Sequence, residues 1–179
     1  KCRPAPLRGE VLSYPRPINT SNKLNYDSKS ISSVKNEQKI TNLPKEGLLW
    51  LDCYNANPQS ILASIKSFVD SGALHTKFHK TLFVIGQVGE LGERSAELHY
   101  DLGLSLNHYI GKESHLFTVG KYAAYIAEGF AQQGKEEVQS KHFEQDHLEQ
   151  LVEHIQKLNP QYIFVKGSRS VRLERLVKP

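Results

Sequence analysis

From residue 47 onward, short apolar runs alternate with longer segments in which apolar residues recur every three or four positions. Each run is short enough to be a buried strand. The runs are Leu48–Asp52, Thr81–Ile85, His115–Val119, Val138–Phe143 and Tyr162–Val165. A separate short extended segment is expected earlier in the chain, at Gly9–Tyr14.

The segments between these runs have helical spacing. Helices are predicted at Pro58–Ser71, from a glycine-rich loop to about His108, at Lys121–Gln133, around Leu148–Leu158 and, as a short helix, near the C-terminus. Strands that alternate with helices favour a parallel sheet with helices on both faces. With right-handed crossovers, the predicted fold class is α/β: a Rossmann-like, doubly wound, mostly parallel sheet of about five or six strands.

Two of the predicted helices have recognisable start signals. Asn57 is a favoured N-cap, and Pro58 suits the first helical position because its missing N–H costs nothing there. Asp146 and Glu149 have the spacing of a capping box ahead of the fourth helix. These residues predict where the two helices begin.

The chain divides into three parts by composition. Residues 1–14 form an introductory segment with the first short strand. Residues 15–45 are rich in Ser, Asn and Lys and poor in apolar residues, which predicts a polar surface loop or insertion. Residues 46–179 carry the regular alternation and are predicted to form the α/β domain. The chain starts at Lys1 and contains no Met, which we interpret as a piece of a longer protein.

The bulk composition narrows the classes of partner. The 179 residues carry a net charge of +4, and the basic residues are spread along the chain apart from a modest cluster at Lys166–Arg175. This charge fits a pocket for a small phosphorylated or carboxylate ligand, and we expect no nucleic-acid partner. No apolar run approaches the roughly 18 residues of a membrane span, so no membrane partner is expected. Two cysteines, Cys2 and Cys53, do not suggest a disulfide framework, and Cys53 is predicted to be a buried filler.

Three polar loops follow predicted strands: Asp52–Asn57, Gly86–Glu93 and Lys166–Arg169. The carboxyl ends of parallel strands share one edge of the sheet, and ligands bind at that edge. We therefore expect the chemistry of the protein to lie among these three loops.

Each loop also has a simpler interpretation. Asp52 is either an exposed turn residue or a carboxylate that accepts hydrogen bonds from a ribose or an amine. Asn57 is explained by helix capping, whereas Asn55 has no such local role and is the better candidate for a ligand contact. The glycine-rich loop has neither GxGxxG nor P-loop spacing and is a weak phosphate cradle or a flexible turn. Lys166–Arg169 is either a solvated basic turn or a site for carboxylate or phosphate oxygens.

The histidines do not form a convincing metal site. His75 and His79 are four residues apart in a predicted loop without a third ligand, and His147 and His154 are seven apart on one predicted helix. We expect no zinc site and no other metal ligands in this chain. Local context does not suggest a nucleophile paired with a histidine base either.

Three motifs together resemble one family. They are DCYNANPQS, IGQVGELGERSAELH and VKGSRSVRLE, and they resemble the C-terminal domain of the Mur ligases over roughly residues 47–177. Within the family they are most similar to the branch that joins D-alanyl-D-alanine to a UDP-N-acetylmuramoyl-tripeptide. The segment around Arg8, PLRG, also resembles the start of this domain, with Leu7 in place of a Gly.

The resemblance implies an ATP-dependent ligase of three domains that acts in peptidoglycan precursor synthesis. The N-terminal domain would hold the UDP-sugar peptide, and the central domain would hold ATP and Mg²⁺ mainly by its own residues. Both are absent from this chain, so the fragment alone is expected to be inactive. The substrate carboxylate would be phosphorylated to an acyl phosphate, which the amine of D-alanyl-D-alanine attacks. The resemblance further implies a cytoplasmic monomer.

The resemblance also implies roles at the nucleotide. Arg8 would reach the ATP phosphates and take part in catalysis. Asp52 would hydrogen-bond the ribose, with Tyr54 and Asn55 around the nucleoside.

Other residues are assigned to the acceptor side by the same resemblance. Lys166, Ser168 and Arg169 would lie near the incoming dipeptide, at its carboxylate. Glu90 and His99 would form or support the cleft wall.

Four positions depart from the family pattern: Leu51, Gln87, Gly89 and Ser170 replace Asp, Asp, Leu and Gly. Two other functions are therefore kept open. One is a ligase of the same superfamily that adds a different amino acid, and the other is a non-catalytic Rossmann-like ligand-binding module. A Walker A motif encoded upstream would favour a ligase.

Overall fold

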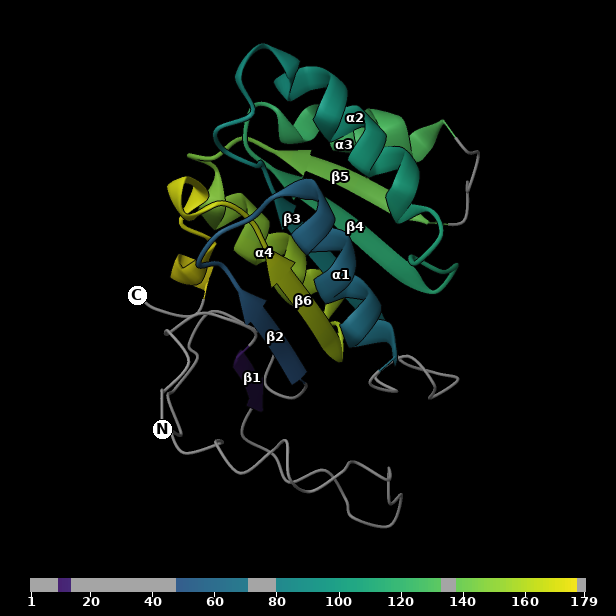
Figure 1. Ribbon diagram of the computed structural model, residues 1–179. Helices are drawn as coiled ribbons and strands as arrows, with labels where there is room; N and C mark the ends of the chain where they lie inside the picture. Colours follow the sequence, from purple (N-terminus) through teal and green to yellow (C-terminus); the bar gives the residue numbers. More distant parts are fainter. Residues whose placement is uncertain (1–9, 14–47, 71–79, 133–137, 177–179) are drawn as a thin grey trace, which may run out of the picture.

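The computed structural model describes residues 10–13, 48–70, 80–132 and 138–176, with only the backbone described for residues 10–13. They form a six-stranded sheet in the order β1-β2-β6-β3-β4-β5. The strands are β1 (Glu10–Ser13), β2 (Leu48–Asp52), β3 (Thr81–Gly86), β4 (Ser114–Val119), β5 (Gln139–Phe143) and β6 (Tyr162–Lys166). Strand β1 is antiparallel to β2, and the other five are parallel, so the predicted mostly parallel sheet is confirmed (Figure 1).

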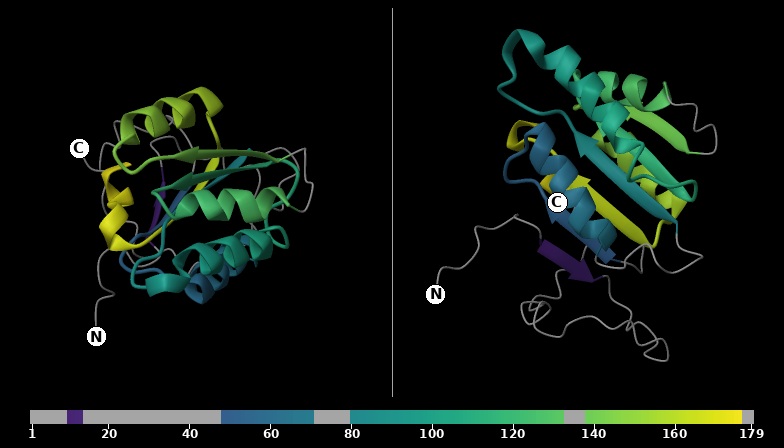
Figure 2. Two further views of the ribbon diagram at one scale, coloured as in Figure 1. Left: turned by 90° about the horizontal axis from the view of Figure 1, so that it is seen from above. Right: turned by 45° about the vertical axis from the view of Figure 1, so that its right-hand side comes forward.

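The helices cover both faces of the sheet. They are α1 (Pro58–Phe68), α2 (Ser95–Leu106), α3 (Ala123–Ala131) and α4 (Leu148–Leu158). Helices α1, α2 and α3 lie on one side and α4 on the other (Figure 2). Three short 3₁₀ helices complete the described part: η2 (Gly92–Arg94), η3 (Arg169–Val171) and η4 (Leu173–Leu176). The C-terminal helix predicted from the sequence is thus a pair of 3₁₀ turns.

The core has two layers, one on each face of the sheet. Ile61, Ile65 and Phe68 of α1 pack on one face, and Leu151 and Ile155 of α4 pack on the other. Strands β3 and β6 are buried at every position because both of their faces are covered. The edge strand β5 exposes its first three residues, which explains its weaker apolar signal in the sequence.

Helices α2 and α3 cross in close contact through two glycines. A Cβ atom at Gly103 would lie 2.2 Å from the backbone oxygen of Ile126, and one at Gly129 would lie 2.2 Å from that of Tyr100. No side chain fits at either position, so both glycines are required by packing. This contact fixes the two helices relative to each other.

The first predicted helix cap is confirmed and the second is wrong. Asn57 caps α1: its side-chain oxygen accepts from the N–H of Ser60 over 2.7 Å, and the Ser60 hydroxyl accepts from the N–H of Asn57. Helix α4 begins after His147 and has no side-chain cap. The N–H of His147 donates to the oxygen of Glu144 instead, which places Asp146 inside a turn rather than at a cap.

Cys53 is fully buried as predicted, and burial raises the pKa of its thiol well above the ordinary range. The described residues include no helix long and apolar enough to cross a membrane. Of the introductory segment, only β1 is described, within the predicted Gly9–Tyr14. The segment 15–45 lies outside the described residues, and so do Cys2, Arg8, His75 and His79.

Candidate functional site

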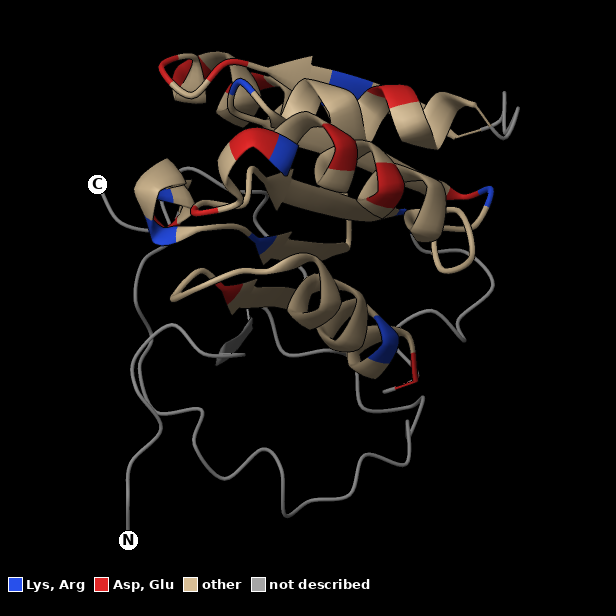
Figure 3. Cartoon of the chain, turned by 45° about the horizontal axis from the view of Figure 1, so that its top comes forward, with Lys and Arg blue, Asp and Glu red and all other residues tan. Residues whose placement is uncertain are grey.

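Two cavities open at the carboxyl edge of the sheet, where connections from neighbouring strands leave to opposite faces. Strand β2 leads to α1 on one face, whereas its neighbour β6 leads to η3, which packs with α4 on the other. Strand β4 leads to α3 and its neighbour β5 to α4, again on opposite faces. Such divergence opens a crevice in a doubly wound sheet. In Figure 3, basic residues on the C-terminal turns lie at this end of the molecule.

The first cavity lies at the ends of β2 and β6 and has a volume of about 290 Å³. We call it the β2–β6 cavity. It is lined by Asp52, Tyr54, Asn55, Ala56, Asn57, Ser60 and Lys166. Sequence analysis assigned five of them to different roles: Asp52, Tyr54 and Asn55 to a nucleoside, Asn57 to a helix cap and Lys166 to a dipeptide. The structure brings these five to one cavity.

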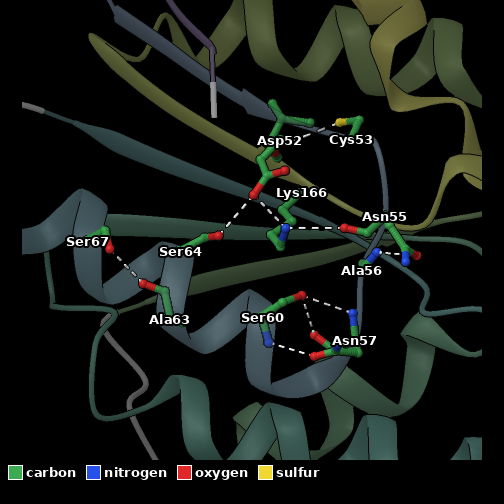
Figure 4. A network of polar contacts seen from close by, with 11 residues as sticks. Asp52, Cys53, Asn55, Ala56, Asn57, Ser60, Ala63, Ser64, Ser67 and Lys166 are labelled. Atoms are coloured by element: carbon green, nitrogen blue, oxygen red, sulfur yellow. Dashed lines mark hydrogen bonds and ion pairs between the residues drawn. The ribbon is translucent and has the colours of Figure 1, made fainter. Parts of the chain in front are cut away.

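Asp52 and Lys166 form an ion pair across the two strand ends. They are register partners in the parallel β2–β6 ladder, and the Nζ atom of Lys166 lies 2.5 Å from Oδ2 of Asp52. The Ser64 hydroxyl donates to the same oxygen over 2.9 Å, and Lys166 also donates to the backbone oxygen of Asn55 over 3.3 Å (Figure 4). The Lys166 side chain is 3% exposed and that of Asp52 15%. Removing one partner of so enclosed a pair leaves an uncompensated charge.

The turn after β2 has more internal hydrogen bonds than the sequence suggested. The side-chain oxygen of Asn55 accepts from the N–H of Ala56 over 2.9 Å, so the expectation that Asn55 has no local role is wrong. Its side chain is exposed at the cavity.

The Arg169 guanidinium lies 6.0 Å from the centre of the Tyr54 ring, within the range of a cation–π contact. Arg169 is thus placed beside the β2–β6 cavity.

The second cavity lies at the ends of β4 and β5 and has a volume of about 430 Å³. We call it the β4–β5 cavity. It is lined by Gln87, Lys121, Glu144, Gln145, Asp146, Val171, Arg172 and Arg175. It combines three cationic side chains with two carboxylates, so it offers partners for both ends of a small zwitterion.

Sequence reasoning missed the β4–β5 cavity because its residues come from four separate segments. The available signals were the basic cluster that includes Arg172 and Arg175, and the position of Lys121 just after a predicted strand. Nothing in the sequence indicated that the acidic turn at Glu144 would face them. That juxtaposition depends on the strand order.

Gln87 follows β3 and is hydrogen-bonded to residues at or after the ends of β4 and β6. Its N–H donates to the oxygen of Val119, and its own backbone oxygen accepts from the N–H of Ser168. Its side-chain oxygen accepts from the N–H of Tyr122 over 3.2 Å. The residue that departs from the family pattern here is therefore bonded to the loops after β4 and β6.

His99 supports the glycine-rich loop through a hydrogen bond to the loop backbone. Its ring is fully buried, with Nδ1 2.6 Å from the oxygen of Ser95 and Nε2 2.8 Å from the backbone nitrogen of Val88. The Val88 N–H requires an unprotonated Nε2, so the proton of the neutral ring is on Nδ1. Burial lowers the pKa of His99, and the Ser95 bond opposes this only in part.

The remaining candidates are divided between the loops. Glu90 is exposed and has a φ of 61°, so it lies at the tip of the loop rather than in either cavity lining. A Cβ atom at Gly89 would lie 3.0 Å from the Ser168 hydroxyl, so a larger residue would crowd Ser168. Arg8 lies outside the described residues. Within the described ranges, His, Cys, Asp and Glu side chains form no group of three that could hold a metal ion.

Comparisons with known proteins agree with this architecture. The sequence profile of the family described as "Mur ligase, glutamate ligase domain" matches residues 38–169. The UDP-N-acetylmuramoyl-tripeptide–D-alanyl-D-alanine ligase of Bacillus subtilis (strain 168) is 31% identical over 135 residues, which is 71% of this chain and 26% of the relative. The enzyme of the same name from Treponema pallidum (strain Nichols) is 32% identical over 128 residues, covering 70% and 26%.

A solved structure is also similar. The crystal structure of MurF from Acinetobacter baumannii matches with a TM-score of 0.53 and 29% identity, over 73% of this chain and 27% of that one.

The fold defines a doubly wound α/β domain with two cavities at the carboxyl ends of its strands. The chain belongs to the Mur ligase family. It spans about a quarter of the length of the curated relatives it matches.

Proposed function

We propose that this chain is the C-terminal domain of an ATP-dependent ligase that joins D-alanyl-D-alanine to a UDP-N-acetylmuramoyl-tripeptide. The proposal rests on the two cavities at one edge of the sheet. One is lined by hydrogen-bonding groups that suit a nucleoside, and the other by cations and carboxylates that suit a dipeptide zwitterion. The names of the curated relatives support the choice of substrates. ATP and a UDP-linked precursor are cytoplasmic metabolites, so we propose a cytoplasmic enzyme, acting as a monomer.

The β2–β6 cavity suits the nucleoside of ATP. Ribose hydroxyls are donors, and Asp52 is a carboxylate that accepts hydrogen bonds. The exposed Asn55 side chain lies beside it. The Tyr54 ring and the Arg169 guanidinium offer flat surfaces at the same cavity, and flat groups of this kind stack on a base. We therefore assign Asp52, Tyr54 and Asn55 to nucleotide binding.

The β4–β5 cavity suits a dipeptide zwitterion. Its volume of about 430 Å³ falls within the range of small-molecule sites, about 300–1,000 Å³. Arg172, Arg175 and Lys121 are available for the carboxylate, and Glu144 and Asp146 for the ammonium group. Before attack the amine must lose a proton, and the nearby carboxylates are acceptors for it.

The remaining chemistry belongs to other parts of the ligase. ATP would phosphorylate the tripeptide carboxylate, the neutral amine would attack the acyl carbon, and phosphate would leave with the C–O electron pair. Mg²⁺ supplies charge neutralisation at the phosphates during such a transfer. We propose that Mg²⁺ is held by the central domain, together with most of the ATP, since this chain offers no cluster of metal ligands within its described residues.

Phosphate release by the full-length protein tests this function. We expect release that requires ATP, the UDP-tripeptide and D-alanyl-D-alanine together, and none from the 179-residue chain alone. A faster reaction with a single amino acid or glutamate would assign the protein to another ligase of the superfamily. Tight binding of an acceptor without phosphate release would instead favour a binding module.

A further inference from the structure

We propose that Lys166 is a positioning residue for the nucleotide and does not bind the dipeptide. The inference rests on the proposed function and deepens it. The motif KGSR alone assigns the Lys166 ammonium to the dipeptide carboxylate, beside Ser168 and Arg169. The contacts of Lys166 instead associate it with the nucleotide site, the β2–β6 cavity.

The Lys166 ammonium is already committed to partners within this chain. It donates to Oδ2 of Asp52 and to the backbone oxygen of Asn55. Its side chain is 3% exposed and lines the β2–β6 cavity, whereas the β4–β5 cavity is lined by other cations. A free carboxylate would have to displace the Asp52 carboxylate to reach it, at the cost of an unpaired buried charge.

The contacts of Asp52 show what the lysine accomplishes. Within the described part of the chain, the two side-chain donors to this carboxylate, Lys166 and Ser64, both bond to Oδ2. Oδ1 accepts no hydrogen bond from the residues that the structure describes, and it is the oxygen we assign to the ligand. The Asp52 side chain is 15% exposed and lines the cavity, and its bonds to Lys166 and Ser64 hold the carboxylate in a fixed orientation there. An orientation fixed in advance reduces the entropy that a bound ribose must offset.

Lys166 also sets the shape of the turn that follows β2. Its bond to the Asn55 oxygen holds the middle of the turn against β6. The Asn57 capping box holds the far end of the turn at the start of α1. The turn is thus fixed at Asp52, Asn55 and Asn57, and two of those three points depend on Lys166.

Lys166→Met tests the role, because methionine keeps the length of the side chain and removes its charge. In the full-length protein, we expect the Kd and KM for ATP to rise at least about tenfold, the effect of losing one charge-assisted hydrogen bond. The KM for D-alanyl-D-alanine should change less than twofold. Lys166→Arg, which keeps the charge, should recover part of the ATP affinity.

Two control variants make the result specific. Lys121→Met removes a cation from the β4–β5 cavity and should raise the KM for the dipeptide without changing that for ATP. Lys157→Met changes an exposed lysine of α4, outside both cavities, and should change neither constant.

A double variant keeps the test valid if Lys166→Met does not fold. Asp52→Asn with Lys166→Met removes both charges and leaves no unpaired ion. If Lys166 acts through Asp52, this variant should bind ATP as weakly as Asp52→Asn alone, within about twofold. A further independent tenfold loss would overturn the positioning role.

The outcomes separate the two proposals. A rise in the dipeptide KM with ATP affinity unchanged, equal rises in both, or no change in either would each overturn the role of Lys166. Wild-type protein that binds ATP without forming the peptide bond would refute the proposed function, while the ATP Kd of the Lys166 variants still decides this inference. Wild-type protein that binds no ATP would refute both.

Discussion

Nε2 of His99 accepts a hydrogen bond from the backbone N–H of Val88 over 2.8 Å, at the base of the glycine-rich loop. The other ring nitrogen lies 2.6 Å from the oxygen of Ser95. A protonated ring would place a second proton on Nε2, facing the Val88 N–H. The folded protein therefore resists protonation of this buried histidine.

This resistance predicts lower stability in mild acid. The folded-state pKa of His99 is below its ordinary value of 6.5, so the unfolded chain binds the proton first. The contribution of neutral His99 to the free energy of unfolding is complete above pH 6.5. It is lost as the pH falls through the lower, folded-state pKa. We expect urea unfolding of the 179-residue chain to show a falling free energy of unfolding over this interval.

Two variants assign the acid effect to its residue. His99→Asn should remove that part of the pH dependence and lower stability at neutral pH by about 1–3 kcal/mol, because the Val88 N–H loses its buried acceptor. His115→Gln is the matched control, because burial and the nearby Lys80 also lower the pKa of His115. It should leave the part of the pH dependence that comes from His99 in place. An unchanged pH profile in His99→Asn would show that other groups are responsible.

The fold was predictable from the sequence because its signals are local. Apolar runs, helical spacing and the Asn57 cap depend on residues close together in the chain, and the structure confirms them. The cap predicted at Asp146 failed because a competing backbone bond, from the His147 N–H to the Glu144 oxygen, forms a turn there. Such competition is not visible in residue types alone.

The site was predictable only to the level of the sheet edge. Alternation placed Asp52 and Lys166 at strand ends, but it did not reveal that β6 inserts between β2 and β3 and makes them register partners. The β4–β5 cavity was missed for the same reason, because Lys121, Glu144 and Arg172 meet only once the strand order is known. Order in a sheet is a long-range property of the packed chain.

Gly103→Ala should destabilise the domain strongly. The added Cβ would lie 2.2 Å from the oxygen of Ile126, a backbone atom that cannot move aside without separating α2 from α3. Overpacking of this kind costs about 1–3 kcal/mol or more. Thermal unfolding should show the loss. Gly111→Ala is the matched control because no atom lies within 4 Å of its added Cβ, and a similar loss there would exclude the helix contact as the cause.

Asn57→Ala should lower stability modestly. It removes the acceptor for the Ser60 N–H and half of the capping box of α1. Loss of such a cap costs about 1 kcal/mol. Asn57→Asp keeps an acceptor and should retain most of the stability in the same unfolding measurement. Equal losses in both variants would contradict the capping explanation.

If the full-length protein has the proposed ligase function, Gln87→Ala should weaken its binding of the acceptor dipeptide. The side-chain oxygen of Gln87 accepts from the Tyr122 N–H and lies against Gly120, so its removal frees the loop after β4 that carries Lys121. One hydrogen bond of this kind is worth about 1 kcal/mol, so we expect the KM for D-alanyl-D-alanine to rise roughly fivefold, with that for ATP unchanged. Gln87→Glu keeps the acceptor oxygen and should retain the loop. Gln150→Ala, at an exposed position of α4, should behave as wild type. A rise in the KM for ATP in Gln87→Ala would mean that the loops after β3 and β4 shape the nucleotide site instead.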